Sequence, residues 1–218
     1  MKNDEMFSSE TVNQAVLDAL TNKKTVLKSL RLAVHKKGDR RPGEITQEIL
    51  NLDLYMRVRL LCLSDEDSTA STRVTNQILK LAGLSEEEAW EAARNNTWEE
   101  IFVGSMSEVL FGDDTVESMF FIATTKDKLD GAAVIAFPEF FKAFCEAHET
   151  TGVCVLPSST EELLLIPETS DMFSYEDMAE LVSSVNASGV TDPRIALDAV
   201  SYRYDSATNT FSIAAMAM

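Results

Sequence analysis

Apolar residues in the first third of the chain follow two different periods. At 9–21 they recur every fourth residue, which predicts an amphipathic helix. From 26 to 34, and again from 55 to 63, apolar and polar residues alternate, which is typical of strands with one buried face. We expect these two strands to pair and to bury their apolar faces together.

The next segment is helical, and its boundaries are marked by local signals. Ser85 and Glu88 have the spacing of a capping box, in which each side chain binds the backbone N–H of the other. Farther on, we expect Trp98, Ile101 and Phe102 to face inward. The elements predicted here are a loop at 64–69, a helix at 74–81 that ends at Gly83, a helix at 86–95 and a short helix near 97–110.

From residue 115 onward, β-rich runs dominate. Residues 153–156 and 163–166 are apolar at every position, so both faces of these strands should be covered, as in the centre of a sheet, and the six-residue link between them fits a hairpin. Other strands are predicted at 116–124, 132–137, 200–204 and 210–214, and helices at Pro138 and Ser174. The apolar stripes expected on the two helices are Phe137, Phe140, Phe141, Phe144, Cys145 and His148 on the first, and Met178, Leu181, Val182 and Val185 on the second.

Strand pairs mixed with separate helices, without a regular β-α-β-α rhythm, predict an α+β fold with mostly antiparallel sheets and flanking helices. The pattern changes near Gly112, where helical spacing gives way to strands. We therefore expect an N-terminal α+β half at 1–112, with a helical segment at 74–110, and a C-terminal α+β half at 113–218. One continuous domain is the alternative.

Charge changes this picture more than any other part of the composition. The 218 residues include 19 Lys and Arg and 36 Asp and Glu, a formal net charge of −17, and residues 101–218 hold 19 of the acids and only 5 of the bases. Such a surface repels a phosphate backbone, so we expect no direct nucleic-acid binding by the C-terminal half. It either docks on a basic protein partner or keeps the protein soluble.

Our leading hypothesis is a non-enzymatic, acidic binding or regulatory protein. A narrower version is a nucleic-acid mimic or inhibitor encoded by a mobile element. The carboxylates expected to form the docking surface are Asp113, Asp114, Glu117, Glu161, Glu162, Glu168, Asp171, Glu176, Asp177 and Glu180.

One segment opposes the acidic trend. Lys36, Lys37, Arg40 and Arg41 lie in a stretch punctuated by glycine and proline, which predicts an exposed loop. This basic loop can hold a phosphate, pair with an acidic face, including the protein's own, or remain a solvated turn. We prefer the solvated turn.

No spacing of glycines fits a nucleotide-binding loop, and we expect no cofactor. Cys145 and His148, with Cys154, are the nearest candidates for metal ligands, since a thiolate and an imidazole three residues apart on a helix can share an ion. They also lie on the phenylalanine stripe. A buried thiol and an imidazole at the edge of the core explain them as well, and we prefer that interpretation.

The link between the two apolar strands holds the candidate catalytic residues, Ser158, Ser159, Glu161 and Glu162. We expect their side chains to project from the end of the sheet, where a hydrolase could use a serine with a carboxylate or with His148. We prefer a structural role, in which the serine hydroxyls cap a tight turn. A third hypothesis, a small-ligand sensor, predicts a deep apolar cavity flanked by Tyr202 and Trp90.

The location expected from the sequence is the cytoplasm. The first residues lack the basic and apolar segments of a secretory signal, and three cysteines form no disulfide framework. No apolar run reaches the length of about 18 residues that a membrane helix needs, so we expect no membrane partner. The pattern carries no signal for the oligomeric state.

Several short motifs follow one another between residues 74 and 205. They are Val74-Thr75-Asn76-Gln77, Glu88-Ala89-Trp90-Glu91-Ala92-Ala93, Asn96-Thr97, Gly131-Ala132-Ala133, Leu156-Pro157-Ser158-Ser159-x-x-Glu162, Val185-Asn186-Ala187-Ser188-x-Val190 and Val200-x-Tyr202-x-Tyr204-Asp205. In this order they resemble a bacterial domain-of-unknown-function family, number 5688, found mainly in gut anaerobes. The resemblance implies fold and kinship but no substrate.

The chain departs from the pattern of that family at two places. Relatives typically have His-Glu after the paired serines, where this chain has Glu161-Glu162, and Thr-Asn where it has Thr124-Thr125. If the serine–histidine turn is catalytic in relatives, the substitution removes the one group whose ordinary pKa is near neutral. Glu161 would serve as a base only if burial raised its pKa. The resemblance therefore argues against enzymatic activity in this chain.

Overall fold

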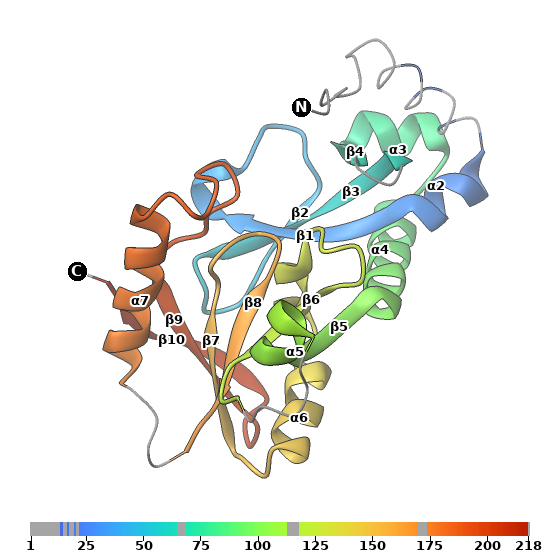
Figure 1. Ribbon diagram of the computed structural model, residues 1–218. Coiled ribbons are helices and arrows are strands. Elements are labelled where there is room, and N and C mark those ends of the chain that lie inside the picture. Colours follow the sequence, from blue (N-terminus) through green and yellow to red (C-terminus); the bar gives the residue numbers. More distant parts are fainter. Residues whose placement is uncertain are drawn as a thin grey trace. The chain divides into compact units, whose positions relative to one another are not determined.

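The structure, a computed structural model, describes residues 14, 17, 20, 22–64, 69–112, 118–169 and 174–217 (Figure 1). It contains helices and two antiparallel sheets, of four and six strands, which confirms the α+β prediction. The chain divides into two compact units. Unit 1 is Met1–Leu32, Arg40–Gln47 and Arg57–Glu99, and unit 2 is Ala33–Asp39, Glu48–Met56 and Glu100–Met218. The division into halves at residue 112 stays a prediction.

The first predicted strand begins later than expected. Residues 23–29 form helix α2 (Lys23–Ser29), and strand β1 (Leu30–Lys36) follows it. The side chain of Asn22 caps α2 by accepting hydrogen bonds from the N–H groups of Lys24 and Thr25. This cap favours a helix at 23–29, where the two-residue alternation of apolar residues predicted a strand. The helix predicted at 9–21 lies outside the described residues, except for residues 14, 17 and 20.

The smaller sheet has the order β1-β3-β2, with β4 paired to β3. Strand β3 (Leu54–Ser64) and its pairing with β1 confirm the prediction. Strand β2 (Thr46–Glu48) is short, and β4 (Thr69–Arg73) was not predicted. Residues 65–68 of the predicted loop lie outside the described residues.

Both helices predicted at 74–81 and 86–95 are present, the first beginning at residue 76 and the second extending to residue 100. Helix α3 (Asn76–Ala82) ends at Gly83, which is left-handed with φ 64°, and α4 (Glu86–Glu100) begins with the capping box between Ser85 and Glu88. The short helix predicted near 97–110 is wrong. Helix α4 continues to Glu100, and strand β5 (Ile101–Ser105) and helix α5 (Met106–Phe111) follow.

Contacts on the buried face of α4 explain why this helix continues beyond residue 97. Thr97 accepts a hydrogen bond from the N–H of Leu32, and Asn96 donates to the carbonyl groups of Leu27 and Leu30. Because these residues hold one face of the helix, Trp98 points elsewhere and is 44% exposed. Phe102 in β5 is 39% exposed, so neither aromatic ring is buried as predicted.

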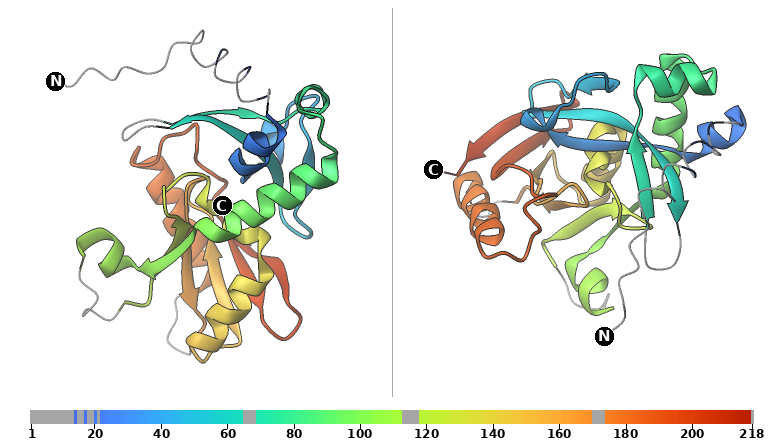
Figure 2. Two further views of the ribbon diagram at one scale, coloured as in Figure 1. Left: turned by 90° about the vertical axis from the view of Figure 1, so that its right-hand side faces the viewer. Right: turned by 90° about the horizontal axis from the view of Figure 1, so that it is seen from above.

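The larger sheet lies in unit 2 and has the order β10-β9-β7-β8-β6-β5. Its central strands are the two that are apolar on both faces, as predicted, and they form an antiparallel pair. Figure 2 shows β5 at one edge, with α5 at its outer end, clear of the central strands. The strands are β6 (Phe121–Thr125), β7 (Gly152–Leu156), β8 (Leu163–Pro167), β9 (Val200–Asp205) and β10 (Thr210–Met216), together with β5.

The strand predicted at 132–137 is wrong. Residues Gly131–Ala136 form a 3₁₀-helix, η2, in which every residue is buried. Its tight turns are closed by bonds from the N–H of Ala133 to the carbonyl of Asp130 and from the N–H of Phe137 to that of Val134. A short apolar run without polar positions has no period, so its pattern does not separate a buried strand from a buried helix.

Two further helices complete unit 2. Helix α6 (Pro138–Ala147) has proline in its first turn, as predicted, and α7 (Tyr175–Ala187) has the capping box between Ser174 and Asp177. Strand β6 is shorter than the predicted 116–124, and residues 116 and 117 lie outside the described residues. No helix in the described part of the chain is long and apolar enough to cross a membrane.

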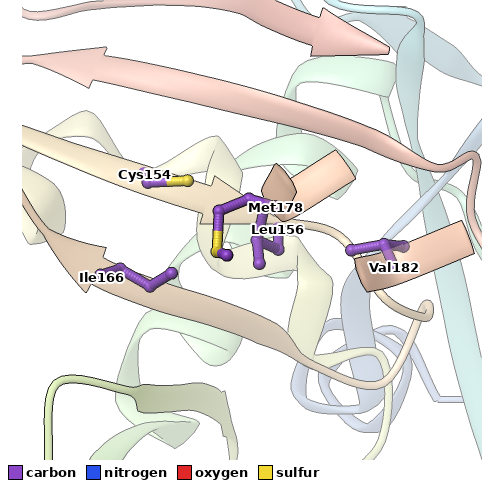
Figure 3. Packing of buried hydrophobic residues seen from close by; sticks show 5 residues of the cluster. All are labelled: Cys154, Leu156, Ile166, Met178 and Val182. Carbon is purple, nitrogen blue, oxygen red and sulfur yellow. The ribbon is translucent and has the colours of Figure 1, made fainter. Parts of the chain in front are cut away.

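Helix α7 packs on the larger sheet through a cluster of buried side chains (Figure 3). Met178 and Val182 of α7 lie against Cys154, Leu156 and Ile166 of β7 and β8. Leu181 was expected in this stripe but is 40% exposed, since Ala179 instead completes the buried face.

We predict that Met178→Ala lowers the free energy of unfolding by about 2–5 kcal/mol, because it leaves a cavity between α7 and the sheet. The matched control is Leu181→Ala on the same helix, which should cost about 1 kcal/mol or less. Urea titrations followed by far-ultraviolet circular dichroism measure both. Equal losses for the two variants would contradict the packing described here.

Candidate functional site at the turn between strands β7 and β8

The link between β7 and β8 is embedded in unit 2 and does not project from the sheet. Ser158, Ser159 and Thr160 are only 8%, 5% and 5% exposed. The N–H of Thr160 donates to the carbonyl of Ile195 at 2.8 Å, and its own carbonyl accepts from the N–H of Ala132 at 3.1 Å. The backbone of the turn is therefore held from two sides by distant segments.

A glycine makes one of these contacts possible. A Cβ atom at Gly131 would lie 2.6 Å from the Cα of Thr124 and closer still to the carbonyl oxygen of Glu161. That oxygen also accepts a 2.6 Å hydrogen bond from the hydroxyl of Thr124. The turn, η2 and the end of β6 thus meet where a side chain larger than hydrogen does not fit.

The two serines of the turn have different roles. The oxygen of Ser159 accepts a hydrogen bond from the N–H of Glu161 at 3.1 Å, which is the turn-capping role that we preferred. The hydroxyl of Ser158 is close enough to the Glu162 carboxyl group to lower its pKa, yet its buried oxygen closes no well-formed hydrogen bond within the described residues.

Glu162 has the most unusual chemistry in the turn. Burial raises the pKa of its carboxyl group, and the Ser158 hydroxyl and the charge of Lys128 offset only part of this rise. A carboxyl group of this kind binds a proton more readily than an exposed one, which a general base requires. Lys128 was missed in the sequence analysis. The signal that pointed to this neighbourhood was the glycine motif at residue 131 within the family resemblance.

Neither histidine is placed beside the turn by the contacts we observe. The ring of His148 packs at a tilt against the rings of Phe121 and Phe144, with centroids 4.4 and 4.3 Å apart, and burial lowers its pKa. The ring of His35 lies 6.0 Å from that of Tyr55. The Ser158–Glu162 pair therefore has no imidazole among the groups that act on its carboxyl group.

The three metal-ligand candidates lie in separate surroundings. Cys145 is buried on α6 and Cys154 is buried beneath α7, whereas His148 packs against the phenylalanine rings described above. Burial raises the pKa of both thiols, that of Cys154 to about 12. Among the described residues, no three His, Cys, Asp or Glu side chains gather in a way that would hold a metal ion.

The carboxylates predicted to form the docking surface have different environments. Burial raises the pKa of Glu168, but hydrogen bonds from Arg203 at 2.7 and 2.9 Å and from the hydroxyl of Tyr175 outweigh it, so its pKa is lowered. Asp177 is occupied in capping α7, while Glu176 and Glu180 are exposed on the same helix. Glu161 and Glu162 are half-buried, and Asp113, Asp114, Glu117 and Asp171 lie outside the described residues.

Two residues of the basic loop bind the protein's own acids. The ammonium group of Lys36 lies 3.9 Å from Asp198, and that of Lys37 lies 3.7 Å from Asp53. Both contacts lie within unit 2. They match the alternative in which the basic loop pairs with acidic residues of the protein itself. Arg40 and Arg41 are exposed residues of unit 1.

Comparison with known proteins agrees with the resemblance found in the sequence. A family model described as a family of unknown function, DUF5688, matches residues 44–206, which confirms that prediction. The turn, η2 and Thr124 all lie inside the matched region. Neither the curated proteins nor the solved structures include a match to this chain.

We predict that Gly131→Ala destabilises the protein by about 1–3 kcal/mol, because the added methyl group pushes η2 away from the turn. Gly38→Ala is the matched control in unit 2. A Cβ atom there meets nothing within 4 Å, so the change should be about 0.5 kcal/mol at most. Urea titration gives both values, and a Gly131→Ala variant as stable as the control would contradict the close approach.

Proposed function

Since the chain belongs to the DUF5688 family, whose description assigns no activity, we propose a function from its own residues: it is a non-enzymatic binding protein that docks on a basic macromolecular partner. The docking surface that we propose consists of exposed carboxylates of helix α7 in unit 2. Glu176 and Glu180 are its central members.

The observation that carries this proposal is how the few bases of residues 101–218 are used. Arg203 binds Glu168 and Asp205, and Arg194 binds Asp192, with its Nη2 2.5 Å from the carboxylate. The hydrogen bond from Arg203 is the main reason that the pKa of Asp205 falls to about 2. Both arginines are therefore neutralised by carboxylates close to them, and neither offsets the negative charge of the exposed carboxylates of α7.

Within the described residues, neither Glu176 nor Glu180 forms an ion pair, and both side chains are exposed. The charge of such carboxylates attracts cationic surfaces and speeds their association, an effect that salt weakens.

A reducing compartment is consistent with this proposal. Cys62, Cys145 and Cys154 are all free thiols, and free thiols persist best in the cytoplasm. We accordingly propose a cytoplasmic partner. The narrower hypothesis of nucleic-acid mimicry would require that the partner itself bind DNA or RNA through the same basic surface.

The test begins with affinity capture from the native host, using the full chain as bait, and continues with the purified partner. We predict that Glu176→Gln/Glu180→Gln slows association with the partner by about tenfold at low salt and has little effect at high salt. The control, Glu87→Gln/Glu91→Gln, removes the same charge from exposed residues of α4.

Stopped-flow or surface plasmon resonance measures the association rates. A partner with an acidic contact surface, or equal slowing by both double variants, would contradict the proposal. Competition between this chain and the partner's DNA or RNA would support the narrower hypothesis of mimicry.

A second candidate function is that of a hydrolase, favoured by one observation. Ser158 has a buried hydroxyl beside a carboxyl group whose pKa is raised, and Lys128 acts on the same group. In this alternative, Glu162 is the general base that takes the proton of Ser158 as its oxygen attacks the carbonyl carbon of an ester, and it returns that proton to the alcohol that leaves as the ester bond breaks; water then hydrolyses the acyl-serine.

If the hydrolase hypothesis holds, Ser158→Ala and Glu162→Gln each abolish ester hydrolysis, and Ser159→Ala keeps it as long as the turn folds. A panel of p-nitrophenyl esters provides the assay, and circular dichroism checks the fold. Hydrolysis that survives in Ser158→Ala, or that is absent from the wild-type chain, speaks for the binding function.

A further inference from the structure

A cleft of about 490 Å³ opens in unit 2, away from the turn and from the proposed docking carboxylates. Strand β5 and α5 form one side and α6 the other (Figure 1). Tyr202 and Trp90, which the sensor hypothesis placed beside a cavity, do not line it. The described residues that do are Val103, Gly104, Ser105, Glu108, Phe121, Phe140, Ala143, Phe144, Ala147 and His148.

Aromatic rings form a continuous part of the lining. Phe144 lies 5.3 Å from Phe121 in an edge-to-face arrangement and 6.3 Å from Phe140 in a stacked one, measured between ring centroids. His148 packs against Phe121 and Phe144 at closer range. Such a surface offers several π faces to a planar ligand and attracts cations to those faces.

One carboxylate is positioned at this surface. A Cβ atom at Gly104 would lie 2.9 Å from Oε2 of Glu108, so the carboxylate rests against the backbone of β5 where a side chain is absent. Within the described residues, it forms no ion pair. Ser105 accepts a hydrogen bond from the N–H of Glu108 and keeps its own hydroxyl proton for donation.

None of the described residues that line the cleft is Lys or Arg, and the imidazole does not supply a positive charge near neutral pH. Burial lowers the pKa of His148, so its ring is neutral there and presents one donor and one acceptor. Glu108 therefore sets the charge of the cleft, and an anionic ligand would be repelled.

We propose that this cleft binds a small organic cation with a planar, apolar body. The body lies on Phe121, Phe140 and Phe144, and the cationic nitrogen lies beside Glu108 and donates to its carboxylate. The volume is in the range of about 300–1,000 Å³ that is usual for small-molecule sites, and a mostly apolar lining with a few polar groups is their common composition. This site is independent of the proposed docking function.

The experiment compares two probes with the same ring system. The probe 9-aminoacridine is a cation at neutral pH, and acridine is neutral. Titration of the full chain, followed by fluorescence polarisation, should show 9-aminoacridine binding at least tenfold more tightly than acridine. Glu108→Gln should weaken binding of the cation by about tenfold and leave acridine binding unchanged, because only the charge-assisted hydrogen bond is lost.

Two controls separate the cleft from the general acidity of the chain. Glu91→Gln removes the same charge from an exposed position of α4 and should leave both affinities unchanged. Ala143→Trp fills the cleft from α6 and should abolish binding of both probes, with circular dichroism confirming that the variant folds. Equal affinity for the two probes, or equal weakening by Glu108→Gln and Glu91→Gln, would overturn the proposal.

Discussion

Unit 2 depends on a close approach between backbones, at the point where Gly131 lies against Thr124 and the carbonyl of Glu161. That approach joins the end of β6, the buried η2 segment and the turn between the two central strands. The same turn carries Ser158, which is 8% exposed, and Glu162, whose carboxyl pKa is raised by burial. A glycine with no function of its own therefore helps to fix the backbone that holds this pair.

Much of the fold was readable from local signals, and the failures have a common cause. The capping box at Ser85, the helix that begins after Ser174 and the strands apolar on both faces were predicted correctly, since each depends on residues within a few positions. The strand expected at 132–137 and the buried Trp98 were wrong because tertiary contacts decide them. The turn between β7 and β8 also depends on tertiary contacts. Its serines were identified from sequence, but Thr124 and Lys128 become its neighbours only when the chain folds.

The acidity of the chain has to be understood side chain by side chain. Carboxylates such as Glu168 and Asp177 serve the fold, one held by Arg203 and Tyr175 and the other at the start of α7. The net charge of the chain includes these carboxylates and the exposed Glu180 with the same weight, although their roles differ. Structural and surface carboxylates therefore respond differently to neutralisation, the first through stability and the second through long-range attraction. Any function that the chain performs through charge rests on the second group.

The thiol of Cys154 can report how often the interior of unit 2 opens to solvent. It lies beneath α7, fully shielded, and its pKa of about 12 leaves almost no thiolate at neutral pH. An alkylating reagent can reach the sulfur only during moments when the helix lifts from β7. The rate of alkylation then measures how often α7 moves away from β7. A ligand or partner that restrains α7 would slow the alkylation of Cys154.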